Sequence, residues 1–344
     1  MIDHAESPRI SSWYSLTGPA REVVLASQVS LNRNLQGVPF QHRLNADGIL
    51  ALRRTIDTAL YALDDEFVLI DGANMSSPLR AFYEDRGILA VGDTPGVSII
   101  SREHDLLIRL GTADHLRISG FAGGLDLAEA RRKAAVLDQR LEEHLEYAVS
   151  LKLGYLSPEI DRVGTGLAAM TVAHLPGIEH SEGLKLPGGE ELERVIMNRY
   201  GRSDEPHGSL YSAVVIASFG ESEDEPIAAL ADYTERLLHY ELEARRELDR
   251  RLGGELADTA GRALGTLRHA RRLAVEETMD LLSLVRLGVA LGYIDEVGLP
   301  EVTDALFVCR DSQVGILQSE DTTVPIDVLR ADLMRRLLGR TTHV

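Results

Sequence analysis

The sequence predicts an α+β protein made of three consecutive units, at residues 1–85, 86–252 and 253–344. Two patterns carry this prediction. Between residues 97 and 121, short β-type runs alternate with turns, a spacing typical of an antiparallel meander rather than of βαβ units. From Gly253 onward nearly the whole chain has helical patterning, which predicts an all-helical C-terminal unit.

Helices are also expected outside the C-terminal unit. Residues 45–63 have apolar side chains at helical spacing after Asn45 and Asp47, and either polar residue would cap the helix. Residues 125–150 and 226–251 show the same spacing, with charged residues at the remaining positions. We therefore predict amphipathic helices in both of these segments.

The remaining segments give weaker signals. Residues 211–219 are a candidate buried strand, whereas residues 1–20 have the pattern of an irregular lead-in. Residues 153–182 contain Gly, Pro and Ser at many positions and include Val163-Gly164-Thr165-Gly166. In the C-terminal unit, breaks between helices are expected near Gly292 and Pro300.

Charge and composition argue against several classes of function. The formal net charge is −18, from 36 Lys and Arg against 54 Asp and Glu, so a broad nucleic-acid interface or docking on anionic lipid is disfavoured. The single cysteine, Cys309, excludes an intrachain disulfide and a cysteine-based zinc site. No apolar run approaches the roughly 20 residues of a membrane span, and residues 1–6 lack signal-peptide features. We therefore expect a cytoplasmic protein.

Two generic motifs have ordinary explanations. Gly164 and Gly166 open a G-x-G-x-x-A pattern, which leaves a nucleotide-redox enzyme as an alternative. However, residues 157–162 are not the buried strand that dinucleotide binding requires before the glycines. His174 and His180 lie six positions apart across a Pro-Gly turn, where ordinary loop histidines are a simpler explanation than metal ligands. No metal site is predicted.

Several segments, taken in their order along the chain, resemble a known family. They are Ser11-Ser12-Trp13 followed by residues 18–35, Asp114-His115-Leu116-Arg117-Ile118, Gly154-Tyr155-Leu156 followed by Val163-Gly164-Thr165-Gly166-Leu167, Tyr200-Gly201 with Gly208-Ser209-Leu210-Tyr211, and Val285-Arg286-Leu287-Gly288. In this order and spacing they resemble the ATP:guanido phosphotransferases (phosphagen kinases), specifically the bacterial protein arginine kinases. The resemblance implies a small helical N-terminal lobe, a larger lobe with an antiparallel sheet flanked by helices, and a helical C-terminal unit.

The resemblance also implies an activity with definite chemical needs. The family transfers the γ-phosphoryl group of ATP to a guanidinium nitrogen, a reaction that depends on positioning and on charge stabilisation. Arginines are suited to clamp a triphosphate because a planar guanidinium pairs two oxygens at once. A carboxylate is needed to orient the guanidinium substrate and to accept its proton.

Most of the implied clamp is missing from this sequence. Among the implied phosphate ligands only Arg117 remains an arginine. The others are replaced by Gln28, Ser30, Ala168 and Met197. If each lost ligand contributed about 1.5–3 kcal/mol independently, the gross loss of stabilisation would be about 6–12 kcal/mol.

The implied base is also missing, because the paired glutamates expected before Asp114 are Thr112 and Ala113. Further candidate site residues come from positions that correspond to the family's site or from charged residues that would compensate for its losses. They are Ser27, Arg86, Arg117, Arg199 and Arg202 for nucleotide binding, Glu159 and Asp161 for acid-base chemistry, and Asp327 and Arg330 for phosphoarginine binding. The alternative for Arg117 is a solvated side chain or a salt-bridge partner, and the alternative for Asp327 and Arg330 is a pair of helix-surface charges.

Two functional hypotheses follow. The first is a catalytically impaired relative of the protein arginine kinases, a pseudokinase that acts by binding a protein partner. The resemblance implies an active paralogue or an adaptor of a Clp-type protease as that partner, and a homodimer as the assembly. The alternative is an active ATP-dependent guanidino or protein-arginine phosphotransferase with a rebuilt site. ATP and magnesium are the implied cofactors if nucleotide binding is retained.

Overall fold

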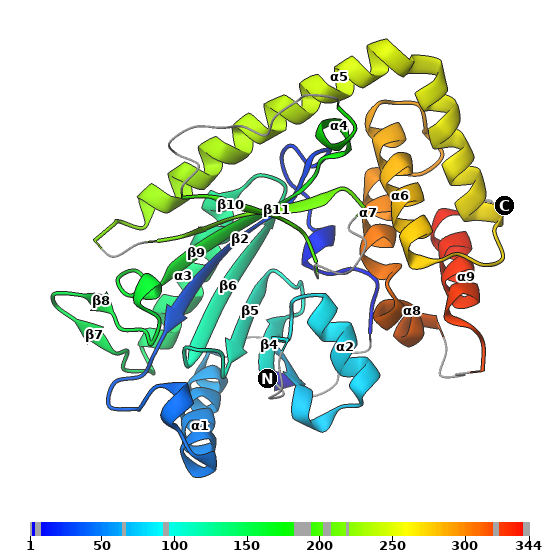
Figure 1. Ribbon diagram of the computed structural model, residues 1–344. Coiled ribbons are helices and arrows are strands. Elements are labelled where there is room, and N and C mark those ends of the chain that lie inside the picture. Colours follow the sequence, from blue (N-terminus) through cyan, green and yellow to red (C-terminus); the bar gives the residue numbers. More distant parts are fainter. Residues whose placement is uncertain are drawn as a thin grey trace.

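A large, mostly antiparallel β-sheet forms the centre of the protein, with helices on both of its faces (Figure 1). The computed structural model describes residues 2–3, 8–63, 67–91, 96–181, 194–201, 208–217, 220–318 and 323–339. Within these residues the sheet has nine strands, of which only the first pair is parallel. In spatial order they are β1 (Ile2–Asp3), β3 (Phe67–Asp71), β4 (Val97–Ser101), β5 (Leu106–Leu110), β6 (Leu116–Gly123), β2 (Val24–Arg33), β9 (Leu167–His174), β11 (Leu210–Ile216) and β10 (Ile196–Arg199).

The predicted meander is confirmed by strands β4, β5 and β6, which pair antiparallel in sequence order. Strands β2 and β9 are central strands that the sequence patterns did not indicate. For β2 the reason is its burial. All ten of its residues are buried, so the alternation of exposed and buried positions that marks a half-buried strand is absent. Strands β2 and β3 come from residues 1–85, so the sheet contains strands from both sides of residue 85.

One face of the sheet packs against helices α1 (Ala46–Ala62), α3 (Leu127–Glu142) and the first part of α5 (Asp224–His269). Asn45 caps α1, since its Oδ1 accepts a hydrogen bond from the Gly48 amide at 2.9 Å. Gly120 of β6 lets α3 approach the sheet closely, because a Cβ at this position would lie 2.2 Å from the Ala130 carbonyl oxygen.

The predicted helix at residues 125–150 is too long, because α3 ends at Glu142. The backbone after it pairs with the end of β2 instead, through a hydrogen bond from the Ala148 amide to the Asn34 carbonyl at 2.8 Å. Next comes a small hairpin of β7 (Val149–Ser150) and β8 (Gly154–Tyr155). The competing strand pairing therefore stops the helix even though the apolar spacing continues.

The other face of the sheet packs against the 3₁₀ helix η1 (Trp13–Ser15), α2 (Ser77–Asp85) and the C-terminal helices. Tyr14 stacks on Phe307 with ring centroids 4.2 Å apart, which places the N-terminal segment against the C-terminal unit. The C-terminal helices are α6 (Val275–Ala290), α7 (Leu299–Val308), α8 (Asp311–Gln318) and α9 (Ile326–Leu338), so the predicted breaks near Gly292 and Pro300 are confirmed.

Helix α5 runs across the sheet and continues into the C-terminal unit (Figure 1). It is kinked at Gly253, whose backbone is non-helical with φ 18° and ψ −93°. Among the described helices, none is long and apolar enough to cross a membrane.

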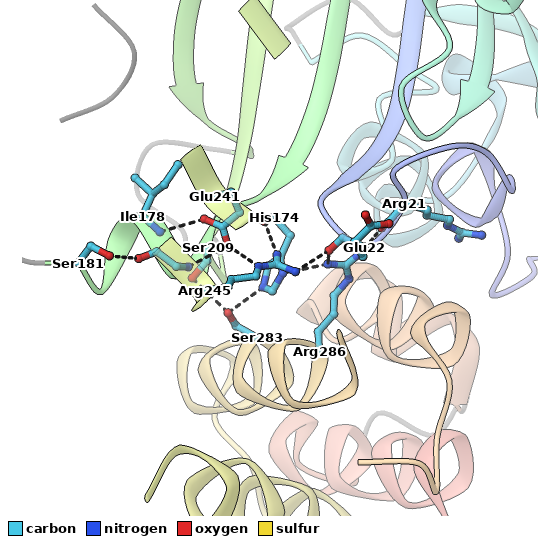
Figure 2. A network of polar contacts seen from close by, with 11 residues as sticks. Arg21, Glu22, His174, Ile178, Ser181, Ser209, Glu241, Arg245, Ser283 and Arg286 are labelled. Atoms are coloured by element: carbon cyan, nitrogen blue, oxygen red, sulfur yellow. Dashed lines mark hydrogen bonds and ion pairs between the residues drawn. The ribbon is translucent and has the colours of Figure 1, made fainter. Parts of the chain in front are cut away.

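A buried polar network joins the end of β9 to the C-terminal unit (Figure 2). Arg286 of α6 donates to Nδ1 of His174 at 2.9 Å and to the Glu22 carbonyl at 3.0 Å. Because Nδ1 of His174 accepts this bond, Nε2 carries the proton and donates to Ser283 Oγ at 2.9 Å. Nearby, the short helix α4 (Pro176–Glu179) is fixed by Glu241 of α5, whose carboxylate accepts from the amides of residues 177 and 178.

Candidate functional site

The candidate site lies on the face of the sheet opposite α3. Side chains alternate along a strand, so Gln28, Ser30 and Asn32 of β2 point to the same face. Directly paired residues of neighbouring strands share that face. The partners on β6 are Phe121, Ser119 and Arg117, and the partners on β9 are Met170 and Ala168.

Among the residues that the structure describes, those at the centre of this face are uncharged. Gln28 Nε2 donates to Ser30 Oγ at 3.1 Å, and Ser30 Oγ lies 2.8 Å from Ser119 Oγ. Ala168, beside Ser30, contributes only a methyl group. The positions at which the family resemblance implies arginines are therefore filled by uncharged groups that largely satisfy one another.

Met197 does not belong to this face. It pairs with Ala213 of β11, and its sulfur accepts a hydrogen bond from Tyr233 of α5 at 3.2 Å. Its side chain is therefore directed to the face of the sheet that α3 and the first part of α5 cover. An arginine at position 197 in this conformation would not reach the group of residues around Ser30.

Three arginines gather at one end of the candidate face. Arg117 of β6 lies directly opposite Arg109 of β5 in the antiparallel register. Arg162, in the 3₁₀ helix η4 (Ile160–Arg162), reaches the same region from the segment before β9. Its Nε contacts the Glu159 carboxylate at 2.8 Å, and its Nη1 lies 3.7 Å from Asp114 Oδ2.

Burial and mutual repulsion shape the electrostatics of this arginine group. Burial and, to a smaller extent, the positive charges of Arg109 and Arg162 together lower the pKa of Arg117 to about 9, against the opposing effect of Asp114 and Glu159. Burial also lowers the pKa of Arg109. Both groups remain cationic at neutral pH because an arginine starts from a pKa of 12.5.

Several polar atoms around this group are buried without a hydrogen-bond partner among the described residues. They are Nε of Arg109, Nε of Arg117, Oδ1 of Asn32 and Oδ2 of Asp114. Leaving a buried donor or acceptor unsatisfied costs about 1–3 kcal/mol. Two donors and two acceptors of these residues therefore lack a hydrogen-bond partner within the described part of the protein.

Arg86, predicted to bind nucleotide, has a structural position instead. It is buried at the C-terminal end of α2, where Nε donates to Gln313 of α8 at 2.8 Å and Nη2 donates to the Arg9 carbonyl at 2.6 Å. Its guanidinium also lies over the Phe82 ring, 4.1 Å from the centroid. Arg86 thus holds α2 to α8 and is not part of the arginine group.

The other predicted nucleotide ligands also lie apart from the arginine group. Ser27 is on the face that packs against α3, where Oγ donates to the Gly124 carbonyl at 2.8 Å and accepts from the Asp126 amide at 3.0 Å. Arg199 is exposed on the edge strand β10, next to Tyr211. Arg202 lies outside the described residues.

Of the two predicted acid-base residues, only Glu159 reaches the arginine group, through its contact with Arg162. Asp161 is exposed on η4. The predicted phosphoarginine ligands lie in the C-terminal unit. Asp327 pairs with Arg272 at 2.7 Å, whereas Arg330 is buried and donates to the carbonyls of Cys309 and Leu273 as well as to Asp311.

The glycines of the G-x-G pattern introduce a strand and not a helix. Gly166 has φ +66° and immediately precedes β9, and a Cβ there would lie 2.6 Å from the Asn32 carbonyl oxygen. Dinucleotide binding needs a helix after the glycines, so the nucleotide-redox alternative is wrong for this motif. Within the described residues, no group of three His, Cys, Asp or Glu side chains is placed to hold a metal ion.

Sequence reasoning missed Arg109 and Arg162. A signal for Arg109 was present, because it is the one charged residue in the apolar run Leu106–Leu110. Its position opposite Arg117 required the register of the hairpin. The residues on this face fit a single anionic group at the arginine end, but they do not fit a triphosphate clamp along the neutral centre.

Comparisons with known proteins match nearly the whole chain. Residues 70–244 match the ATP:guanido phosphotransferase, C-terminal catalytic domain, and residues 253–343 match the protein-arginine kinase McsB C-terminal domain. Among curated relatives, a protein-arginine kinase of Pelotomaculum thermopropionicum is 31% identical, with 95% of each chain covered. One of Halothermothrix orenii is 29% identical over 96% of this chain and 97% of its own length.

Solved structures share the fold at lower identity. The duplicated taurocyamine kinase of Schistosoma mansoni, with bound transition-state-analogue components, has a TM-score of 0.56 at 21% identity and covers 80% of this chain and 41% of its own. A lombricine kinase structure has a TM-score of 0.56 at 19% identity, covering 70% of this chain and 73% of its own.

Proposed function

Because the chain belongs to the ATP:guanido phosphotransferase family, in its protein arginine kinase branch, we propose that it is a catalytically impaired member that acts by binding. The observation that carries the proposal is the neutral centre of the candidate face. There the family resemblance implies arginines, and the chain has Gln28, Ser30 and Ala168.

The physical argument concerns charge in the transition state. Phosphoryl transfer involves little covalent chemistry by the protein and depends on cations placed around the phosphates. Three missing charge-assisted hydrogen bonds, at about 1.5–3 kcal/mol each, would together remove about 4.5–9 kcal/mol. Since about 1.4 kcal/mol changes a rate tenfold, a loss of this size lowers turnover by several orders of magnitude.

The arrangement of carboxylates supports the same proposal. In the turn before β6, Thr112 donates its hydroxyl to the Asp114 carbonyl at 3.2 Å, and Ala113 has no polar side chain. Asp114 is fully buried, and its Oδ1 accepts from Asn34 at 2.6 Å and from Ser157 at 2.8 Å. A carboxylate held in this way is poorly placed to take a proton from a guanidinium substrate.

In the proposed role the chain uses its retained scaffold to bind a protein partner in the cytoplasm. The partner would be an active paralogue or an adaptor of a Clp-type protease, and the chain would form a homodimer. ATP and magnesium would bind weakly or not at all. The scaffold that supports this role extends through both family-matched regions.

Calorimetric titration with ATP, with and without magnesium, tests the proposal, together with mass spectrometry of phosphoarginine on a protein substrate. The protein-arginine kinase of Pelotomaculum thermopropionicum is a matched positive control. We expect no micromolar affinity and no phosphoarginine. Micromolar ATP binding together with phosphoarginine formation would overturn the proposal.

One observation favours an active enzyme with a rebuilt site as the second candidate. Arg109 and Arg162 bring positive charge to Arg117 from positions to which the resemblance gives no role, and Glu159 lies beside Arg162. This candidate predicts measurable phosphotransfer that Arg117→Ala abolishes. An inactive wild-type protein across guanidino substrates argues against it.

A further inference from the structure

Arg109 and Arg117 form an unusual pair across neighbouring strands. They are directly opposite one another in the β5–β6 register, and their side chains therefore leave the sheet on the same face. Like charges in this position are destabilising. The chain carries only 36 basic residues against 54 acidic ones, so a group of arginines needs a specific explanation.

The surrounding carboxylates offset the charge of this pair only in part. Asp114 directs Oδ1 to Asn34 and Ser157, and its nearest cation is Arg162 at 3.7 Å. Glu159 is likewise held by Arg162. The Nε–H groups of Arg109 and Arg117 remain buried and without an acceptor in the part of the chain that the structure describes.

We infer that Arg109 and Arg117, with Arg162 beside them, bind a single phosphate group, either free phosphate or the phosphoryl group of a monoester. A phosphate oxygen accepts from guanidinium groups with short, charge-assisted hydrogen bonds, and its negative charge removes the repulsion between the arginines. The site lies on the same face of the sheet as the neutral centre on which the proposed function rests. Two of its arginines, Arg109 and Arg162, have no counterpart in the clamp that the family resemblance implies.

The unpartnered acceptors indicate which anion the site prefers. Asn32 is the cross-strand neighbour of Arg117, and its Oδ1 is buried without a donor, as is Oδ2 of Asp114. Both atoms need a hydrogen-bond donor from the ligand. Protonated phosphate has a hydroxyl group to donate and fully ionised sulfate has none, so the site should prefer phosphate over sulfate.

The neutral residues beside the pair limit the size of the anionic group. Ser30 and Ala168 provide no positive charge for a second or third phosphate. We therefore expect inorganic phosphate and a phosphate monoester to bind, and the additional phosphates of ATP to add little affinity.

The test is titration of the wild-type chain and of Arg109→Leu with inorganic phosphate, by calorimetry and by thermal unfolding, with sulfate and ATP in parallel. In phosphate-free buffer we expect Arg109→Leu to unfold at the same or a higher temperature than wild type, because the repulsion is gone. Phosphate should raise the melting temperature of wild type, and Arg109→Leu should bind phosphate at least tenfold more weakly. Replacing a residue with a purely structural role would lower the melting temperature in phosphate-free buffer, so it would not combine unchanged or higher stability with weaker phosphate binding.

Arg246→Leu removes the same charge from an exposed position on α5 and should leave phosphate binding unchanged. If Arg109→Leu fails to fold, Arg109→Lys keeps the charge without the planar fork and should still weaken binding. The inference is overturned if millimolar phosphate does not stabilise wild type, or if Arg109→Leu retains the full phosphate effect. Because neither measurement involves turnover, its failure is distinguishable from that of the proposed function.

Discussion

Arg286 donates a hydrogen bond to Nδ1 of His174 at 2.9 Å, and neither side chain is exposed to solvent. This contact fixes a neutral imidazole between a strand of the sheet and a helix of the C-terminal unit. Burial lowers the pKa of His174 well below its usual 6.5, and the charges of Arg286 and Arg245 lower it further. Glu241 forms an ion pair with Arg245, and the backbone carbonyls of residues 21 and 22 accept hydrogen bonds from Arg286, so these groups engage the arginines rather than the imidazole.

Stability should therefore fall as the medium becomes acidic. Below pH 6.5 the unfolded chain protonates residue 174 and the folded chain does not, so the unfolded state binds more protons. Above pH 6.5 the contribution is fully present, and below it each pH unit costs up to about 1.4 kcal/mol. Urea unfolding of wild type and His174→Gln between about pH 5 and 8 measures the difference. A variant with the same pH slope as wild type would contradict the assignment.

Removing the guanidinium of Arg286 should destabilise the protein strongly. Arg286→Met leaves His174 Nδ1 and the carbonyl of residue 21 without their donor and removes one of the two donors to the Glu22 carbonyl, the other being Arg245. The expected loss in the free energy of unfolding is about 2–4 kcal/mol. Arg271→Met, at an exposed position just before α6, is the control and should change stability by less than about 0.5 kcal/mol. Equal effects from the two changes would be evidence against the network.

Restoring cations to the neutral face should strengthen nucleotide binding. Gln28→Arg combined with Ala168→Arg places two guanidinium groups beside Ser30, and we expect ATP affinity to rise at least tenfold by calorimetry. Gln28→Met with Ala168→Met is the matched control, because it adds bulk without charge. No gain from the arginine variant, with its fold intact by circular dichroism, would mean that charge is not what the face lacks.

The contact of α3 with the sheet should be sensitive to a single methyl group. Gly120→Ala would place its Cβ 2.2 Å from the Ala130 carbonyl oxygen, so the helix must move, at a cost of about 1–3 kcal/mol. The same substitution at Gly261, an exposed position on α5 with open space around it, should stabilise the protein by about 0.5–1 kcal/mol. Thermal denaturation of both variants shows whether their signs are opposite.

The sequence patterns predicted the meander, α1 and the C-terminal helices because their periodicity is local. Strand β2 lacks that periodicity, because its polar side chains are buried within the sheet face. The predicted length of α3 was too great, because strand pairing beyond Glu142 competes with the helical spacing.

The candidate site was harder to predict than the fold. Arg117 could be selected from the chain alone, and the neutral residues at positions 28, 30 and 168 could be listed. The pairing of Arg109 with Arg117 depends on the register of a hairpin, and the orientation of Met197 depends on an edge strand. Arg86 was selected because its position in the chain corresponds to a nucleotide-binding position of the family, but its contact with Gln313 shows a packing role.

The kinked helix α5 is shared between the sheet and the helices that follow it, and Tyr14 at the other end of the chain rests on Phe307. The sheet and the C-terminal helices therefore each bury part of the apolar surface of the other. Cutting the chain at Gly253 would give two fragments with exposed apolar surfaces, and such fragments aggregate. The protein should accordingly melt as one cooperative body in a calorimeter, with a single heat-absorption peak.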